Sequence, residues 1–198
     1  ANLICRIYDV ESGVIYFGEH QLEKLNLKLL RKEIGYVPQD GYLFSGTVEE
    51  NISFGSDQIS RAKIEQVAST VEISTDIMKF ANQYETIVGE RGVQLSGGQR
   101  QRIAIARAIY KSPSIFIFDD CLSAVDSNKE QKILANLQKE TQKRTTIMIS
   151  HRISAIQNAD LILVLEDGEI KEKGKHQELL ESKGFYYRIF EKQNKKQT

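Results

Sequence analysis

The stretch from Leu95 to Asp126 most constrains what this chain can fold into. A Gly-Gly pair opens an amphipathic segment, Gly97 to Tyr110, whose apolar residues have the spacing of one helix face. An apolar run, Ile115 to Phe118, comes next and is followed directly by two carboxylates. Short continuous apolar runs are typical of strands buried on both faces of a parallel sheet. The stretch therefore predicts a helix followed by a central strand of an α/β domain.

Further segments alternate between strand and helix patterns. Ile34 to Val37 and Thr145 to Ile149 have the composition of buried strands, and Asp167-Gly168 predicts the turn of a hairpin. Ser127 followed by Glu130 predicts a capping box at the start of another helix. This alternation favours an α/β fold with a mostly parallel sheet flanked by helices.

The chain also suggests an internal division. The segment from Ser60 to Phe80 has helical spacing and is more polar than its surroundings. We therefore expect a catalytic core formed by residues 1–55 and 96–198, interrupted by a helical subdomain at about 56–95. Asn2 to Tyr8 is apolar on one face and is predicted to be the end of a helix.

Composition narrows the class of protein. The chain has 198 residues, and its 27 Lys and Arg balance its 27 Asp and Glu. A neutral balance does not favour a nucleic-acid partner, because such proteins usually carry a basic patch. The 2 cysteines lack metal-ligand spacing, which fits a reducing cytoplasmic environment. The longest apolar runs are strand-length, well short of the roughly 20 residues that a membrane-spanning helix needs.

Two acids follow the apolar run from Ile115 to Phe118. They would lie at the carboxyl end of a parallel strand, the edge of the sheet where ligands bind. One carboxylate, Asp119, suits holding Mg²⁺, and the adjacent Asp120 suits orienting a nucleophilic water. Taken alone, this stretch is equally compatible with a strand followed by an acidic turn.

The segment from Leu95 to Gln99 places Ser96 and two glycines at a helix start. Ser96 suits the N-cap, and the first backbone N–H groups with the helix dipole form a ready anion site. By itself, a Gly-Gly start would favour a plain helix cap. The continuation Arg100-Gln101-Arg102 and the acidic strand beyond it favour phosphate chemistry instead.

Together, residues Leu95 to Asp120 resemble the signature motif and Walker B strand of ABC-type ATPase domains. Tyr36 to Gln39 resembles the Q-loop, Ser123 to Asp126 the D-loop, and Ile149 to His151 the switch-histidine strand. Thr86 to Gly92 is similar to the X-loop that marks ABC exporters. The resemblance covers essentially the whole chain and implies a P-loop NTPase-like fold.

The resemblance implies roles around one bound ATP. Asp119 would hold Mg²⁺, and Gln39 would contact the metal and the attacking water while sensing the transmembrane domain. Asp120 occupies the position of the catalytic base, and His151 would contact the γ-phosphate.

It also implies roles at the partner's site and at the membrane domain. The family sandwiches nucleotide between two head-to-tail domains, so the signature residues would contact ATP held by the opposite subunit. These residues are Ser96, Gly97, Gly98 and Gln99. Ser123 and Asp126 would communicate across the dimer. Glu90 and Arg91, with Gln39, would couple the domain to the membrane segments.

One departure from the family pattern concerns the P-loop. The motif G-x-x-x-x-G-K-[ST] needs a hydroxyl residue after its Gly-Lys pair. The one such pair here, Gly174-Lys175, is followed by His176. We therefore expect a partial domain that lacks the P-loop and the first strands and binds ATP poorly by itself.

A second departure is Asp120, which stands where the family's usual catalytic base is Glu. Asp is one methylene shorter, and the positioning of a reacting water is sensitive to displacements near 1 Å. We expect a slow or degenerate site, of the kind found in heterodimeric exporters, so a heterodimer is favoured.

Three functions remain open on these grounds. The first is the ATPase of an ABC exporter at the cytoplasmic face of the membrane, using ATP and Mg²⁺ with a transmembrane domain and a second ABC domain. The second is a degenerate, regulatory subunit of a heterodimeric exporter. The third, a non-transport ABC ATPase acting on DNA, is disfavoured because the sequence has neither a long coiled-coil insertion nor a strongly basic charge balance. The resemblance places substrate specificity in membrane segments outside this sequence.

Overall fold

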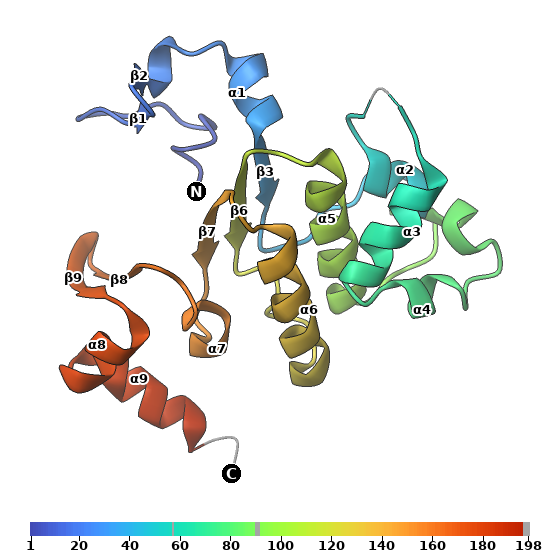
Figure 1. Cartoon of the computed structure of the whole chain (residues 1–198). Coiled ribbons are helices and arrows are strands. Elements are labelled where there is room, and N and C mark those ends of the chain that lie inside the picture. Colours follow the sequence, from blue (N-terminus) through green and yellow to red (C-terminus); the bar gives the residue numbers. More distant parts are fainter. Residues whose placement is uncertain (57, 90–91, 196–198) are drawn as a thin grey trace. The chain divides into compact units, whose positions relative to one another are not determined.

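The computed structural model describes residues 1–56, 58–89 and 92–195. They form two compact units, Ala1–Ile147 and Met148–Thr198 (Figure 1). The larger unit opens with turns, and the helix end predicted at Asn2 to Tyr8 is wrong. Arg6 there has a positive φ of 48°, a backbone conformation that a right-handed helix cannot contain.

Short elements then lead into the central sheet. The strands β1 (Tyr16–Phe17) and β2 (His20–Gln21) pair antiparallel and precede the 3₁₀ turn η1 (Leu22–Lys24). The helix α1 (Leu27–Glu33) begins after Asn26, whose side-chain oxygen accepts the N–H groups of Lys28 and Leu29. This N-cap satisfies two of the backbone donors that a helix start leaves unpaired.

The central sheet has the strand order β3-β6-β7. Its strands are β3 (Ile34–Val37), β6 (Ile115–Asp119) and β7 (Thr145–Ile149). The strands β3 and β6 run parallel, and Val37 pairs with Phe118. Phe116, Ile117 and Phe118 of β6 are buried, as predicted, and Ile115 is partly buried. The prediction that β7 is buried is wrong, because this strand lies at an edge of the described sheet and is half-exposed.

The helix α5 (Gly97–Lys111) lies between the sheet and a group of shorter helices (Figure 1). These are α2 (Val48–Ser53), α3 (Arg61–Thr70) and α4 (Ser74–Ile77). The strands β4 (Gly46–Thr47) and β5 (Ile87–Val88) pair antiparallel nearby, and the 3₁₀ turn η2 (Gln83–Glu85) precedes β5. The proposed subdomain boundary at about 56–95 stays a prediction.

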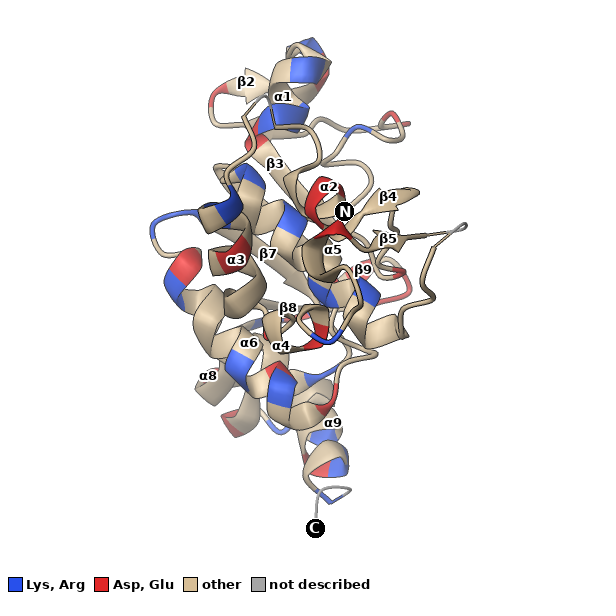
Figure 2. Cartoon of the chain, turned by 90° about the vertical axis from the view of Figure 1, so that its right-hand side faces the viewer, with Lys and Arg blue, Asp and Glu red and all other residues tan. Residues whose placement is uncertain are grey.

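The helix α6 (Ser127–Glu140) begins one residue earlier than its sequence pattern indicates. Its N-cap is Asp126, whose carboxylate accepts the N–H of Lys129 at 3.0 Å. The predicted capping box of Ser127 and Glu130 is therefore wrong, because Asp126 takes the cap position and Ser127 becomes the first helical residue. Acidic and basic residues are interspersed along the ribbons of α3 and α6 (Figure 2).

The smaller unit contains the helix α7 (Ile153–Ile156) and the predicted hairpin of β8 (Ile162–Glu166) and β9 (Glu169–Gly174). Both turn residues have positive φ, 51° at Asp167 and 79° at Gly168, as a tight hairpin turn requires. The helices α8 (His176–Glu181) and α9 (Phe185–Asn194) follow. The core of this unit consists of Ile153, Ile162, Leu179 and Tyr186. None of the helices in the described ranges is long and apolar enough to cross a membrane.

Candidate functional site

The carboxyl ends of β3 and β6 carry the acidic part of the candidate site. Because the two strands are parallel and end in register, the residues that follow them emerge at one edge of the sheet. The amide Nε2 of Gln39 donates to Oδ2 of Asp120 at 3.3 Å. The hydroxyl of Tyr36 donates to Oδ2 of Asp119, also at 3.3 Å. The structure therefore brings Gln39, Asp119 and Asp120 together, while their catalytic roles stay predictions.

Tyr36 is a site residue that the sequence analysis missed. Burial raises the pKa of its hydroxyl to about 12, and the charge and hydrogen bond of Asp119 add to the shift. The hydroxyl therefore keeps its proton at neutral pH and acts as a donor to Asp119. Tyr36 pairs with Ile117, so Asp119, two residues further along β6, is its diagonal neighbour on the same face of the sheet. The signal was the strand register, which the sequence does not specify.

The turn after β6 fixes the backbone of Asp120. Its φ is +44°, in the left-handed region that Asp tolerates better than most residues. The backbone N–H and the hydroxyl of Ser123 both donate to the carbonyl of Asp120, at 3.3 and 2.9 Å. Burial raises the pKa of the neighbouring Cys121 to about 12, so its thiol stays protonated and fills the turn as a small apolar group.

The residues at this edge fit a magnesium ion. Within the described ranges, no three side chains of His, Cys, Asp or Glu are grouped so as to hold a metal by themselves. Mg²⁺ needs no such cage, since it is usually bound by one or two carboxylates together with substrate phosphates and water. The carboxylate of Asp119 and the amide of Gln39 supply hard oxygen donors of that kind.

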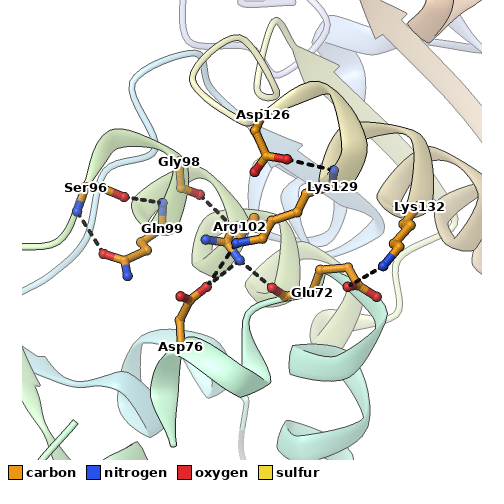
Figure 3. A network of polar contacts seen from close by, with 9 residues as sticks. All are labelled: Glu72, Asp76, Ser96, Gly98, Gln99, Arg102, Asp126, Lys129 and Lys132. Atoms are coloured by element: carbon orange, nitrogen blue, oxygen red, sulfur yellow. Dashed lines mark hydrogen bonds and ion pairs between the residues drawn. The ribbon is translucent and has the colours of Figure 1, made fainter. Parts of the chain in front are cut away.

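The start of α5 carries the second part of the site (Figure 3). Ser96 is the N-cap, as predicted, and its Oγ accepts the N–H of Gln99 at 3.2 Å. Gln99 returns the contact, because its Oε1 accepts the N–H of Ser96 at 2.9 Å. In the sequence, the S-x-x-Q spacing from Ser96 to Gln99 was the signal for this reciprocal contact, which is a capping box. The N–H groups of Gly97 and Gly98 have no acceptor within the helix, as is usual for the first turn, and their binding of an anion stays a prediction.

The two glycines also allow a close contact within the chain. A Cβ at Gly98 would lie 2.7 Å from the carbonyl oxygen of Ala124, and one at Gly97 would lie 3.2 Å from the Cβ of Ala124. The loop that carries Asp120 and Asp126 therefore packs directly on the start of α5. This second reason for the glycines could be found only from the structure.

A partly buried ion pair joins the start of α5 to the neighbouring helices (Figure 3). Arg102, only 4% exposed, donates to the carbonyl of Gly98 at 3.1 Å and to Oδ2 of Asp76 at 2.7 Å. It also donates to the carbonyl of Glu72. Lys129 of α6 lies 3.7 Å from the same carboxylate oxygen of Asp76. Burial alone would raise the pKa of Asp76, but the hydrogen bond and charge of Arg102, with nearby lysines, lower it overall.

The remaining predicted residues are His151, Glu90 and Arg91. His151 belongs to the smaller unit, where its carbonyl accepts Nε2 of Gln193 at 2.7 Å. Oε1 of Gln193 in turn accepts the N–H of Ile153 at 3.0 Å, so one side chain of α9 holds the backbone on both sides of Arg152. Glu90 and Arg91 lie outside the described residues.

A parallel sheet whose edge carries paired acids, beside a helix with a glycine-rich start, is consistent with a P-loop NTPase-like domain. Residues 1–123 match the family described as ABC transporter. The chain therefore belongs to the ABC transporter family.

Individual relatives agree with this assignment. The chain is 42% identical over 197 residues to human ATP-binding cassette sub-family B member 5, covering 100% of this chain and 16% of that protein. It is 44% identical over 190 residues to the probable multidrug resistance ABC transporter ATP-binding/permease protein YheI of Bacillus subtilis, covering 96% of this chain and 32% of that protein.

A solved structure agrees as well. The structure of a bacterial Atm1-family ABC exporter with ATP bound superposes with a TM-score of 0.93 at 40% identity, covering 98% of this chain and 34% of that chain. The chain thus spans a third or less of the curated relatives named here.

Proposed function

We propose that this chain is the ATP-hydrolysing part of an ABC-type exporter. It would act at the cytoplasmic face of a membrane, pair with a second ABC domain around ATP and drive a transmembrane domain. The relatives support this proposal, since those compared here include an exporter and a permease protein. The observation that carries it is the contact between Gln39 and Asp120 at the sheet edge.

In the proposed reaction, water attacks the γ-phosphate of ATP in line with the leaving group. Asp119 and Gln39 would hold Mg²⁺, which when bound neutralises charge on the phosphate oxygens. An Asp120 carboxylate oxygen would orient the water and accept its proton. A carboxylate can accept several hydrogen bonds, so the bond from Gln39 holds Asp120 in place while another lone pair faces the water.

The test uses the full-length protein that carries this chain, purified with its membrane domain. We expect Asp119→Asn to lower the rate of ATP hydrolysis by about 100-fold, because the substitution removes the negatively charged oxygen ligand that would hold Mg²⁺. Asp167→Asn is the matched control, because it removes one exposed carboxylate and leaves a turn sequence that suits the hairpin. Equal hydrolysis rates for the two variants would contradict the proposal.

A second function deserves a test because of Asp120. Its side chain is one methylene shorter than Glu, its backbone is left-handed, and Gln39 already contacts it. These features favour a slow site in a regulatory subunit, paired with a different and more active ABC domain. In that case Asp120→Glu should raise the hydrolysis rate of the purified full-length protein by about tenfold. Rapid hydrolysis by the unmodified protein as a homodimer would exclude this second function.

A further inference from the structure

Gln101, in the second turn of α5, is a polar side chain that the proposed reaction does not use. It is 3% exposed and forms hydrogen bonds to two separate loops. Its Nε2 donates to the carbonyl of Gln39 at 2.9 Å and to Oγ of Ser123 at 3.1 Å. Its Oε1 accepts the N–H of Ala124 at 3.0 Å. The carbonyl of Gln39 can only accept and the N–H of Ala124 can only donate, so the amide has one orientation.

These hydrogen bonds close a ring around the candidate catalytic groups. Gln101 holds the backbone of Gln39, whose side chain reaches Oδ2 of Asp120. On the other side, Gln101 holds Ser123, whose hydroxyl donates to the carbonyl of Asp120 at 2.9 Å. Both ends of the contact between Gln39 and Asp120 are therefore attached to one side chain.

The backbone around Gln101 leaves these loops little room to move apart. Gly41, two residues after Gln39, has a φ of +56°. A Cβ at Gly41 would lie 2.8 Å from the backbone nitrogen of Gln101, so the loop rests directly on α5. On the second loop, the carbonyl oxygen of Ala124 would lie 2.7 Å from a Cβ at Gly98. Gln101 thus sits at the point where both loops touch the same helix.

We propose that Gln101 is a positioning residue that couples the loop of Gln39 to the loop of Asp120. A displacement of either loop is transmitted to the other through its amide, so the distance between the Gln39 amide and the Asp120 carboxylate is held constant. The effect on catalysis rests on the proposed function, but the mechanical coupling does not. Glu at this position would keep the shape and the acceptor but lose both donors, and Leu would lose all three contacts.

The kinetic test compares Gln101→Glu with Gln131→Glu in the full-length protein. Gln131 is an exposed residue of α6, so this control introduces the same charge on the surface. We expect Gln101→Glu to lower kcat by about tenfold and to leave KM for ATP within about twofold, because the water-orienting groups shift and binding contacts do not. A lower melting temperature with unchanged kcat would show that Gln101 is only structural and would overturn the proposal.

A double-mutant cycle with Gln39→Ala then tests the route of the effect. If Gln101 acts through Gln39, the loss caused by Gln101→Glu should shrink from about tenfold to about twofold when Gln39 is already Ala. Losses that multiply independently would contradict the coupling.

Hydrogen exchange separates this proposal from the proposed function. In Gln101→Leu we expect the amides of residues 39–41 and 121–124 to exchange faster together, each by about fivefold or more, while α3 keeps its rates. A response in one loop alone would overturn the coupling, whether or not the protein hydrolyses ATP. If the coupling is present but the unmodified protein is inactive with ATP and Mg²⁺, the proposed function fails and the coupling stands.

Discussion

Tyr36 illustrates what a single side chain contributes to the sheet edge. Its hydroxyl stays protonated at neutral pH, since burial and the neighbouring carboxylate raise its pKa to about 12, and it can donate to Asp119 at 3.3 Å or to Oδ1 of Asn2 at 3.4 Å. The hydrogen bond from Tyr36 thereby orients the carboxylate of Asp119, the acid that would hold the metal, from the neighbouring strand of the same sheet. A donor of this kind orients the carboxylate in the way that outer partners orient metal ligands.

The pKa of Tyr36 predicts a specific response to alkali. Its value in the folded state, about 12, lies above the ordinary 10.0, so the unfolded state releases the proton first as pH rises. The contribution of the Tyr36 hydroxyl to the unfolding free energy is fully present below pH 10 and is lost as pH rises toward 12. We expect Tyr36→Phe to reduce the loss of unfolding free energy over this range by about 1 kcal/mol, allowing for solvent screening.

Urea unfolding at several pH values measures this effect. Tyr42→Phe is the control, since the Tyr42 side chain is 62% exposed. Identical pH profiles for the unmodified protein and Tyr36→Phe would show that the raised pKa has no consequence for stability.

At the scale of elements, α5 organises the larger unit. Its first turn and N-cap contain the signature residues, and Gln101 forms hydrogen bonds to two loops. Arg102 contacts Asp76 of α4, which also lies near Lys129 of α6. A buried ion pair contributes less through attraction than it costs when one partner is removed and the other charge is left alone. We therefore expect the contact between Arg102 and Asp76 to affect the unfolding free energy most clearly when one of the two charges is removed.

We predict that Asp76→Asn lowers the unfolding free energy by about 2 kcal/mol at pH 7, because Arg102 loses its charged partner. The folded-state pKa of Asp76 lies below the ordinary 3.8, so its stabilising effect is present above pH 3.8 and is lost as pH falls through the folded value. The difference between Asp76→Asn and the unmodified protein should shrink in acid.

Urea unfolding at pH 7 and pH 3 checks this prediction. Glu65→Gln breaks an exposed ion pair with Arg61, and it should change stability by less than about 0.5 kcal/mol. A difference for Asp76→Asn that is the same at both pH values would contradict the role of the charged pair.

The local elements were more predictable from sequence than their contacts. The apolar run of β6, the N-cap at Ser96 and the turn at Asp167-Gly168 follow from patterns within a few residues, and the structure has all of them. The cap of α6 was misplaced by one residue because Asp126 and Ser127 are both good N-caps. Periodicity shows which face of an element is buried, but it does not show which loops meet.

The candidate site was predictable to the same extent. The acids and glycines were found from their motifs, whereas the pairing of Tyr36 with Asp119 depends on strand register. The role of Gln101 depends on two loops folding back on one helix. Such long-range contacts leave no local signature.

For the molecule as a whole, the division into two units predicts uneven protection from exchange. Side chains of α5 such as Ile103 and Ile105 are 0% exposed, whereas Leu163 and Leu165 of the hairpin in the smaller unit are 47% and 65% exposed. We expect backbone amides in α5 to exchange about 100-fold more slowly than those of β8 and β9, measured by mass spectrometry. Equal protection would show that the two units open as one.

The reciprocal hydrogen bonds of Ser96 and Gln99 have a consequence for how the start of α5 would bind a ligand. The hydroxyl oxygen uses a lone pair to accept the Gln99 N–H, so in the proposed function its own proton would be available to donate to a phosphate oxygen. The helix start thus has its final shape before a ligand arrives, and docking loses little conformational entropy. In the proposed function, this preformed helix start would let the partner's ATP dock without local refolding.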